Sequence, residues 1–92
     1  MRLRFDFSGL RTAGSVFKNP SGAFAGALLE HAGCKGLRVG GAEVSARHAN
    51  IVVARPGATL SDIAALRGIM SERVAFDSGI LLESEIQTWQ DS

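Results

Sequence analysis

The chain has 92 residues, which suffice for one modest hydrophobic core and leave no room for a second domain. Its 46% apolar and 21% charged residues are typical of a folded globular chain and exclude a disordered one. A formal net charge of +1 excludes the broad basic surface that binds nucleic acid. Because there is one cysteine and no apolar run near the ~20 residues that cross a bilayer, we expect a cytoplasmic protein without disulfides or membrane contact.

The first third of the chain contains signals for a strand, a loop and a helix. Charged and apolar residues alternate over 2–7, which predicts a half-buried strand. Residues 10–23 contain glycines and a proline and are predicted to form a structured loop. Ser21 is placed to cap a helix that ends at Gly33 in the left-handed conformation. Its apolar stripe, at helical spacing, consists of Ala25, Leu28, Leu29 and Ala32.

The middle of the chain predicts short strands and then a long helix. Residues 34–50 are punctuated by glycines, and residues 51–54 are β-branched and predict a buried strand. Residues 59–62 (TLSD) match a helix start, with an acidic residue near the positive end of the helix dipole. The helix is expected to end at about Phe76, taken as a packing residue, before Gly79. Its apolar stripe consists of Ile63, Leu66, Met70 and Val74.

The last segment, residues 80–89, predicts a closing strand that carries Glu83, Glu85 and Gln87 on one face. The order of elements then predicts an α+β fold: a small two-layer domain with a mixed sheet and two main helices. We expect residues 1–92 to form this single domain.

The segment most informative about chemistry is 14–20 (GSVFKNP), which carries a hydroxyl, an ammonium group and a carboxamide on a restricted backbone. Ligand contacts concentrate on such loops, although a surface turn with a solvated Lys18 is the reading that composition alone favours. The glycines of 33–41 lack the GxGxxG spacing of a dinucleotide-binding turn. His31 and His48 are distant in the sequence, so we expect no metal site.

Four segments resemble, in the same order and spacing, UDP-N-acetylenolpyruvoylglucosamine reductase (UDP-N-acetylmuramate dehydrogenase) of bacterial peptidoglycan synthesis. The segments are 14–20 (GSVFKNP), 25–36 (AGALLEHAGCKG), 38–50 (RVGGAEVSARHAN) and 82–86 (LESEI). They cover about residues 12–87 and resemble the C-terminal, substrate-binding domain of that family.

The resemblance implies an oxidoreductase reaction in which NADPH reduces FAD and the reduced flavin delivers hydride to UDP-N-acetylglucosamine enolpyruvate. It implies that Ser15 is the general acid and that Glu85 is its partner at the enolate. It also implies that Asn19 and His48 contact the substrate. Lys35 and Arg38 could meet the diphosphate of a UDP-sugar, although solvated surface charges are the alternative.

The two FAD-binding domains that precede this domain in the family have no counterpart in the sequence, so we expect neither FAD nor NADPH to bind this chain alone. One hypothesis is therefore a reductase domain that is inactive without a flavin-binding domain or chain. The alternative is a non-catalytic, stand-alone module that binds a UDP-sugar or a protein. The face with Ser15, Asn19 and Glu85 should expose apolar surface and allows a weak homodimer.

Overall fold

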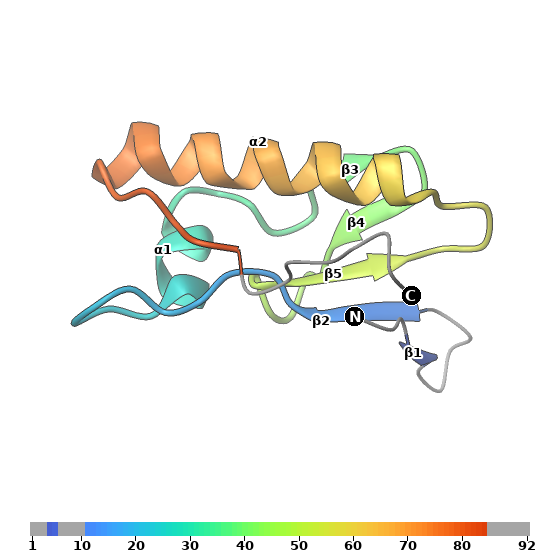
Figure 1. Ribbon diagram of the computed structural model, residues 1–92, viewed down its shortest axis with the longest axis horizontal. Coiled ribbons are helices and arrows are strands. Elements are labelled where there is room, and N and C mark those ends of the chain that lie inside the picture. Colours follow the sequence, from blue (N-terminus) through green and yellow to red (C-terminus); the bar gives the residue numbers. More distant parts are fainter. Residues whose placement is uncertain (1–3, 6–10, 85–92) are drawn as a thin grey trace.

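The computed structural model describes residues 4–5 and 11–84, which form one antiparallel sheet and two helices (Figure 1). The strands are β1 (Arg4–Phe5), β2 (Arg11–Ser15), β3 (Arg38–Val39), β4 (Ala42–Val44) and β5 (Ile51–Ala54), and the helices are α1 (Ala25–His31) and α2 (Leu60–Ser78). The sheet order is β1-β2-β5-β4-β3. Helix α2 lies along the sheet, and α1 packs against α2 near one end of it. The predicted α+β fold with two helices is therefore confirmed.

Each strand pair within the described residues is antiparallel, so the expected mixed sheet is wrong on this point. For the pairs β3–β4 and β4–β5, the physical reason lies in the connections. Glycines at 40 and 41 join β3 to β4, and a short turn over residues 45–50 joins β4 to β5. Connections this short can join only antiparallel neighbours, because a parallel pair needs a crossover of a dozen or more residues.

The hydrophobic core lies between α2 and the sheet. As predicted, α2 buries its apolar stripe completely or nearly so: Ile63, Leu66, Met70 and Val74. Strands β4 and β5 bury alternate residues, so β5 is half-buried and not enclosed on both faces. Helix α1 buries Ala25 and Leu29 against the same core. Phe76 does not pack in it, because its side chain is 96% exposed.

The ends of α2 follow the sequence signals closely. The Asp62 amide donates to Thr59 Oγ1 at 3.0 Å, and the Thr59 amide donates back to Asp62 Oδ2 at 3.2 Å, which completes a capping box. Hydrogen bonds from the amides of Thr59 and Gly41 hold the pKa of Asp62 below its usual range. The helix ends at Gly79, whose φ of 73° is the left-handed conformation that glycine adopts at little cost.

Two predictions for the first third of the chain are wrong. Residues 11–15 form β2, where a loop was expected, because they pair with β5: Arg11 with Ala54, Thr12 with Val53 and Ser15 with Ile51. This pairing depends on a strand far away in the sequence and overrides the local loop signal. Ser21 also does not cap α1; the amide of Ala25 donates instead to Asn19 Oδ1 at 2.9 Å. Gly33, at φ 78°, does follow the helix in the left-handed conformation.

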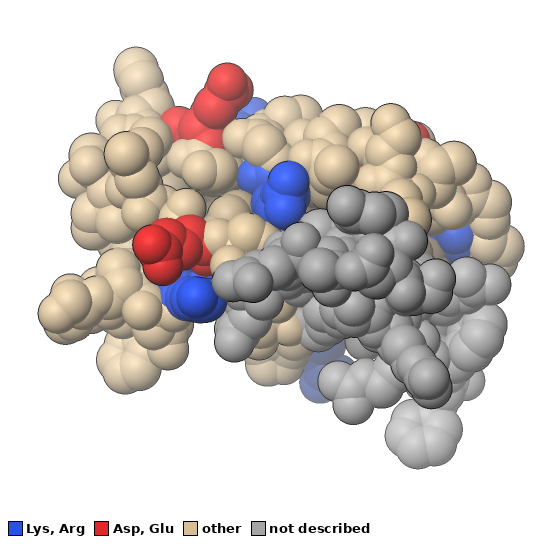
Figure 2. Space-filling view, in the orientation of Figure 1, with Lys and Arg blue, Asp and Glu red and all other residues tan. Residues whose placement is uncertain are grey.

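The C-terminal segment is described as far as Ser84, which forms a single antiparallel bridge with Phe17. Residues 80–83 have no regular structure, and the rest of the predicted strand, including Glu85 and Gln87, lies outside the described residues. Of the strand predicted at 2–7, only residues 4–5 are described, and they pair with β2. In the described part of the chain, neither helix combines the length and hydrophobicity needed to cross a membrane. On the face shown in Figure 2, acidic and basic side chains are scattered among uncharged ones.

Candidate functional site

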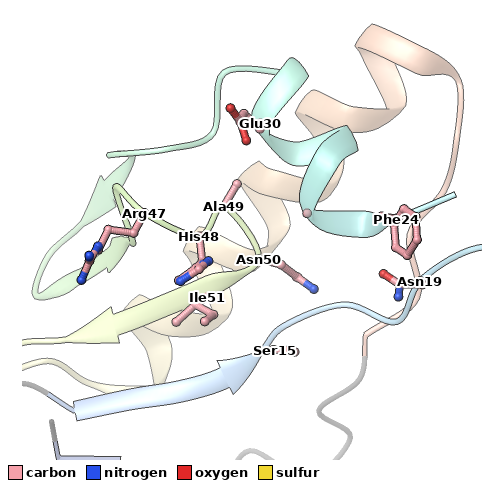
Figure 3. A pocket seen from close by; sticks show the side chains of 10 residues that line it. Ser15, Asn19, Phe24, Glu30, Arg47, His48, Ala49, Asn50 and Ile51 are labelled. Atoms are coloured by element: carbon pink, nitrogen blue, oxygen red, sulfur yellow. The ribbon is translucent and has the colours of Figure 1, made fainter.

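A hollow of about 390 Å³ lies between the end of β2, the N-terminal part of α1 and the turn that precedes β5 (Figure 3). Three of the four predicted site residues, Ser15, Asn19 and His48, line it. Figure 3 shows that they come from two segments of the chain: Ser15 and Asn19 from the stretch that starts at the end of β2, and His48 from the turn before β5. The fourth, Glu85, lies outside the described residues. The fold thus gathers the described members of the predicted site around one hollow.

Ser15 is an exposed residue on a firmly held stretch of backbone. It is the last residue of β2 and pairs with Ile51, after a shift in strand register between Thr12 and Ser15. The next residue, Val16, is fully buried, and its amide donates to the Asn50 carbonyl at 2.9 Å. Irregularities of this kind occur beside active sites, where they redirect a side chain out of the regular pleat. Here the irregularity precedes a hydroxyl at the rim of the hollow.

The residues after Ser15 are held from two sides. Phe17 is 3% exposed, and its backbone bonds the carboxamide of Asn50: the Phe17 amide donates to Oδ1 at 3.0 Å, and Nδ2 donates to the Phe17 carbonyl at 2.9 Å. On the other side, the Lys18 amide donates to the Glu83 carbonyl at 2.8 Å. The backbone of residues 17–18 therefore lies directly beside residues 83–84.

The Asn19 side chain accepts a hydrogen bond from the start of α1, and this bond orients the side chain at the hollow. Its Oδ1 accepts a hydrogen bond from the amide of Ala25, the first residue of α1. The carboxamide is therefore oriented by the helix, and its Nδ2 is left as the group that can donate to a ligand. The sequence predicted a ligand contact at Asn19 and gave no indication of this role at the helix start.

His48 lies on the turn before β5 together with Arg47, and both side chains are exposed at the hollow. The turn is fixed by Ser45, whose Oγ accepts from the amides of Arg47 at 3.1 Å and His48 at 3.3 Å. Arg47 is the basic residue that lines this hollow, and sequence reasoning missed it. The available signal was its position next to His48 inside a segment already singled out.

The two cations proposed from the sequence for a diphosphate lie elsewhere. Neither Lys35 nor Arg38 lines the hollow. Lys35 Nζ lies 3.3 Å from the carboxylate of Glu30, in an ion pair on α1 and the turn after it. Arg38 is exposed on β3, at the far edge of the sheet from β2. Arg47, unlike either of them, lines the hollow.

The remaining ionisable candidates are not grouped. In the described part of the chain, no cluster of three or more His, Cys, Asp and Glu residues could hold a metal ion. His31 is exposed, as expected, and its Nδ1 lies 2.6 Å from Asp77 Oδ2 on α2. The hydrogen bond and charge of Asp77 raise the pKa of His31. Cys34 is fully buried, and burial raises the pKa of its thiol.

Apolar side chains are exposed near the site, as the sequence predicted for this face. Phe24 is 71% exposed and lines the same hollow as Ser15. Leu81 is 80% exposed and lines a neighbouring hollow of about 270 Å³ together with Lys18 and Asn19. Phe24 and Leu81 are thus exposed apolar groups beside the predicted site residues. The homodimer expected through this face stays a prediction.

Comparison with known proteins gives a consistent result. Residues 6–89 match the family model described as "UDP-N-acetylenolpyruvoylglucosamine reductase, C-terminal domain". The chain is 53% identical over 77 residues to the UDP-N-acetylenolpyruvoylglucosamine reductase of Moorella thermoacetica, covering 84% of this chain and 26% of the relative. It is 52% identical over 81 residues to the same enzyme of Heliobacterium modesticaldum, covering 87% of this chain and 26% of the relative.

Among solved structures, the chain is similar to the UDP-N-acetylenolpyruvylglucosamine reductase of Thermus caldophilus, with a TM-score of 0.68 and 39% sequence identity. The match covers 84% of this chain and 27% of that one. The chain thus spans about a quarter of the length of the relatives it matches.

Proposed function

The chain belongs to the family of the UDP-N-acetylenolpyruvoylglucosamine reductase C-terminal domain, and we propose that it supplies the substrate-binding and proton-donating part of that reaction. The reaction reduces UDP-N-acetylglucosamine enolpyruvate to UDP-N-acetylmuramate, a precursor of peptidoglycan. The observation that carries the proposal is the meeting of Ser15, Asn19 and His48 around one hollow. Residues 1–92 would act as a single domain, and we place the reaction in the cytoplasm.

The chemical contribution that we assign to this chain is a proton. Reduction of the enolpyruvyl double bond adds a hydride to one carbon and a proton to its neighbour, which lies next to the carboxylate. The neighbouring carbon develops negative charge, so the reaction needs a donor held close to it. We assign this role to the Ser15 hydroxyl, which stands exposed at the rim of the hollow on an anchored backbone. Solvent would then reprotonate Ser15. Glu85 would stabilise this negative charge in its protonated form, because an ionised carboxylate would repel the enolate.

Recognition of the substrate would use donors and a cation, because its diphosphate and carboxylate are anionic. Asn19 offers Nδ2, since its Oδ1 already accepts from Ala25. Arg47 offers a planar guanidinium that can bond two oxygens of one phosphate or carboxylate. His48 lies beside it on the same turn. Glu30 also lines the hollow, but its carboxylate is paired with Lys35, so the Asn19 amide and the Arg47 guanidinium remain as donors for the anionic groups of this substrate.

FAD and NADPH do not fit the described residues. The main hollow, at about 390 Å³, is near the lower end of the roughly 300–1,000 Å³ of small-molecule sites. It could not hold a dinucleotide in addition to a sugar nucleotide. We assign both cofactors to a flavin-binding domain or chain and derive no step through them. Phe24 and Leu81 are candidates for the surface that such a partner covers.

A chimera tests this function. Residues 11–92 would replace the matching segment of the Moorella thermoacetica reductase, and NADPH oxidation would be measured with and without the enolpyruvyl substrate. We expect turnover, and we expect Ser15→Ala to lower kcat by about 10²–10⁴-fold, the usual contribution of a general acid, with NADPH-dependent flavin reduction unchanged. The matched control is Ser21→Ala, an exposed hydroxyl of the same segment.

Two outcomes would contradict the proposal. Undiminished turnover by the Ser15→Ala chimera would remove the proton-donor role. A chimera that binds the UDP-sugar and reduces its flavin but never turns over would favour the stand-alone binding module instead.

A further inference from the structure

We propose that Asn50 is a positioning residue for Ser15, because its carboxamide fixes the backbone from which the Ser15 hydroxyl is presented. The inference rests on the proposed role of Ser15. The two residues line the same hollow, and Figure 3 shows the Asn50 side chain pointing from the turn before β5 toward the stretch of chain that follows Ser15. Asn50 would act through Ser15 and need not touch the reacting atoms.

The side chain of Asn50 continues the pairing of β2 with β5 past Ile51, the first residue of β5. The last regular partners are Ser15 and Ile51. Before Ile51 the backbone turns, with the Ile51 amide donating to the His48 carbonyl at 3.0 Å. On this side no residue of β5 remains to pair with Phe17, whose other edge forms the bridge with Ser84. The Asn50 carboxamide takes that place by exchanging both hydrogen bonds with Phe17, at 3.0 and 2.9 Å. This copies the exchange of two N–H···O bonds between partners in an antiparallel ladder.

The bonds after Ser15 matter because the ladder before it is irregular. The register shifts between Thr12 and Ser15, so the pairing of Arg11 and Thr12 with β5 does not run evenly into Ser15, which pairs with Ile51 after the shift. Downstream, the amide of Val16 bonds the Asn50 carbonyl, and both main-chain groups of Phe17 bond the Asn50 side chain. Asn50 therefore makes three hydrogen bonds to the two residues that follow Ser15.

An asparagine suits this position because bonding both the amide and the carbonyl of Phe17 requires an acceptor and a donor side by side. Aspartate has the same shape, but its ionised carboxylate only accepts, and one oxygen would face the Phe17 carbonyl. A protonated aspartate regains the missing donor. Leucine has a similar volume and neither group. These differences provide a graded set of substitutions: Asn50→Asp at high pH, Asn50→Asp at low pH, and Asn50→Leu.

The test measures turnover in the chimera described above. At neutral pH, Asn50→Asp and Asn50→Leu should each lower kcat by about 100-fold, the cost of displacing a catalytic group by about 1 Å, with KM changed by less than about threefold. The activity of Asn50→Asp, relative to the native chimera, should recover as the pH falls through the pKa of the new carboxyl group, whereas Asn50→Leu should not recover.

A double mutant separates positioning from general destabilisation. If Asn50 acts through Ser15, then Ser15→Ala together with Asn50→Leu should be hardly slower than Ser15→Ala alone. The control is Thr59→Ala, which breaks the capping box of α2, does not line the hollow and should leave kcat unchanged. Additive effects of the two substitutions, or native kcat in Asn50→Leu, would overturn the proposal.

The 92-residue chain alone provides a readout that does not depend on turnover. Amide exchange followed by NMR should be faster by at least about tenfold at Phe17 in Asn50→Leu than in Thr59→Ala, since the bond that protects it is lost. Unchanged protection at Phe17 would overturn the positioning role even if the chimera is active. An inactive native chimera with lost protection at Phe17 would instead refute the proposed function and leave the anchoring by Asn50 in place.

Discussion

Asn19 allows stability and ligand recognition to be separated by two substitutions of one residue. Its Oδ1 accepts from the first amide of α1, and its Nδ2 is the group that we assign to the substrate. Asn19→Ala removes both groups. Asn19→Asp keeps an acceptor for the Ala25 amide and adds a negative charge near the N-terminus of a helix, but it removes the donor. The two variants should therefore differ in stability, and both should bind the substrate more weakly than the native chain.

The expected magnitudes follow from these contacts. Asn19 is not the N-cap residue of α1, which is Phe24, but it accepts from the first helical amide as a cap would. Loss of such an acceptor costs about 1 kcal/mol of the free energy of unfolding, within a range of roughly 0.5–2. For a domain of this size, 1 kcal/mol corresponds to a fall in Tm of about 4–8 °C. Asn19→Asp should stay within about 0.5 kcal/mol of the native chain, because the acceptor remains and the helix dipole favours the added charge.

The loss of binding is larger than the loss of stability. A hydrogen bond to a charged group contributes about 1.5–3 kcal/mol, which corresponds to a rise in Kd of roughly 10–150-fold. Because Asn19 is exposed, Asn19→Ala should fall at the lower end of this range. Asn19→Asp should exceed it, since its carboxylate also repels an anionic ligand.

The assays are equilibrium unfolding in urea, followed by circular dichroism, and calorimetric titration with UDP-N-acetylglucosamine enolpyruvate. Asn19→Gln serves as a control that keeps the carboxamide but places it one methylene group farther from the backbone. Equal destabilisation by Asn19→Ala and Asn19→Asp would show that Oδ1 does not stabilise the start of α1. Native affinity in Asn19→Asp would show that Nδ2 does not face the ligand.

Two further predictions concern the fold. Gly40 has φ +55°, and a Cβ there would lie 2.5 Å from the carboxylate of Asp62, which caps α2. Gly40→Ala should therefore lower the free energy of unfolding in urea by about 1 kcal/mol more than Gly36→Ala, which adds only left-handed strain (φ +83°, no atom within 4 Å). Equal losses in the two variants would contradict the clash. Because Asp77 raises the pKa of His31 above 6.5 in the folded chain, their pair stabilises fully below pH 6.5 and weakens as pH rises through the raised pKa. Unfolding measured against pH should show this loss in the native chain and not in His31→Asn; an identical pH profile would refute it.

Several features of this protein were determined by the sequence alone because their causes are local. The capping box of α2 lies within residues 59–62, its buried stripe follows helical spacing, and Gly33 and Gly79 mark helix ends. The four motif segments also identified the family without any knowledge of the fold. Each of these signals depends on neighbours within a turn or two, or on a pattern that can be read along the chain.

Other features depended on residues that meet only after folding. β2 exists because residues 11–15 pair with β5, although their composition is typical of a loop. The hydrogen bond from Ala25 to Asn19 forms only because α1 begins beside Asn19. The hydrogen bonds between Asn50 and Phe17 form only because the turn before β5 ends beside the stretch of chain that continues from β2. The sequence does not indicate whether the carboxamide of an asparagine binds a ligand, a helix end or a strand. Only its partners distinguish these roles, and tertiary packing selects the partners.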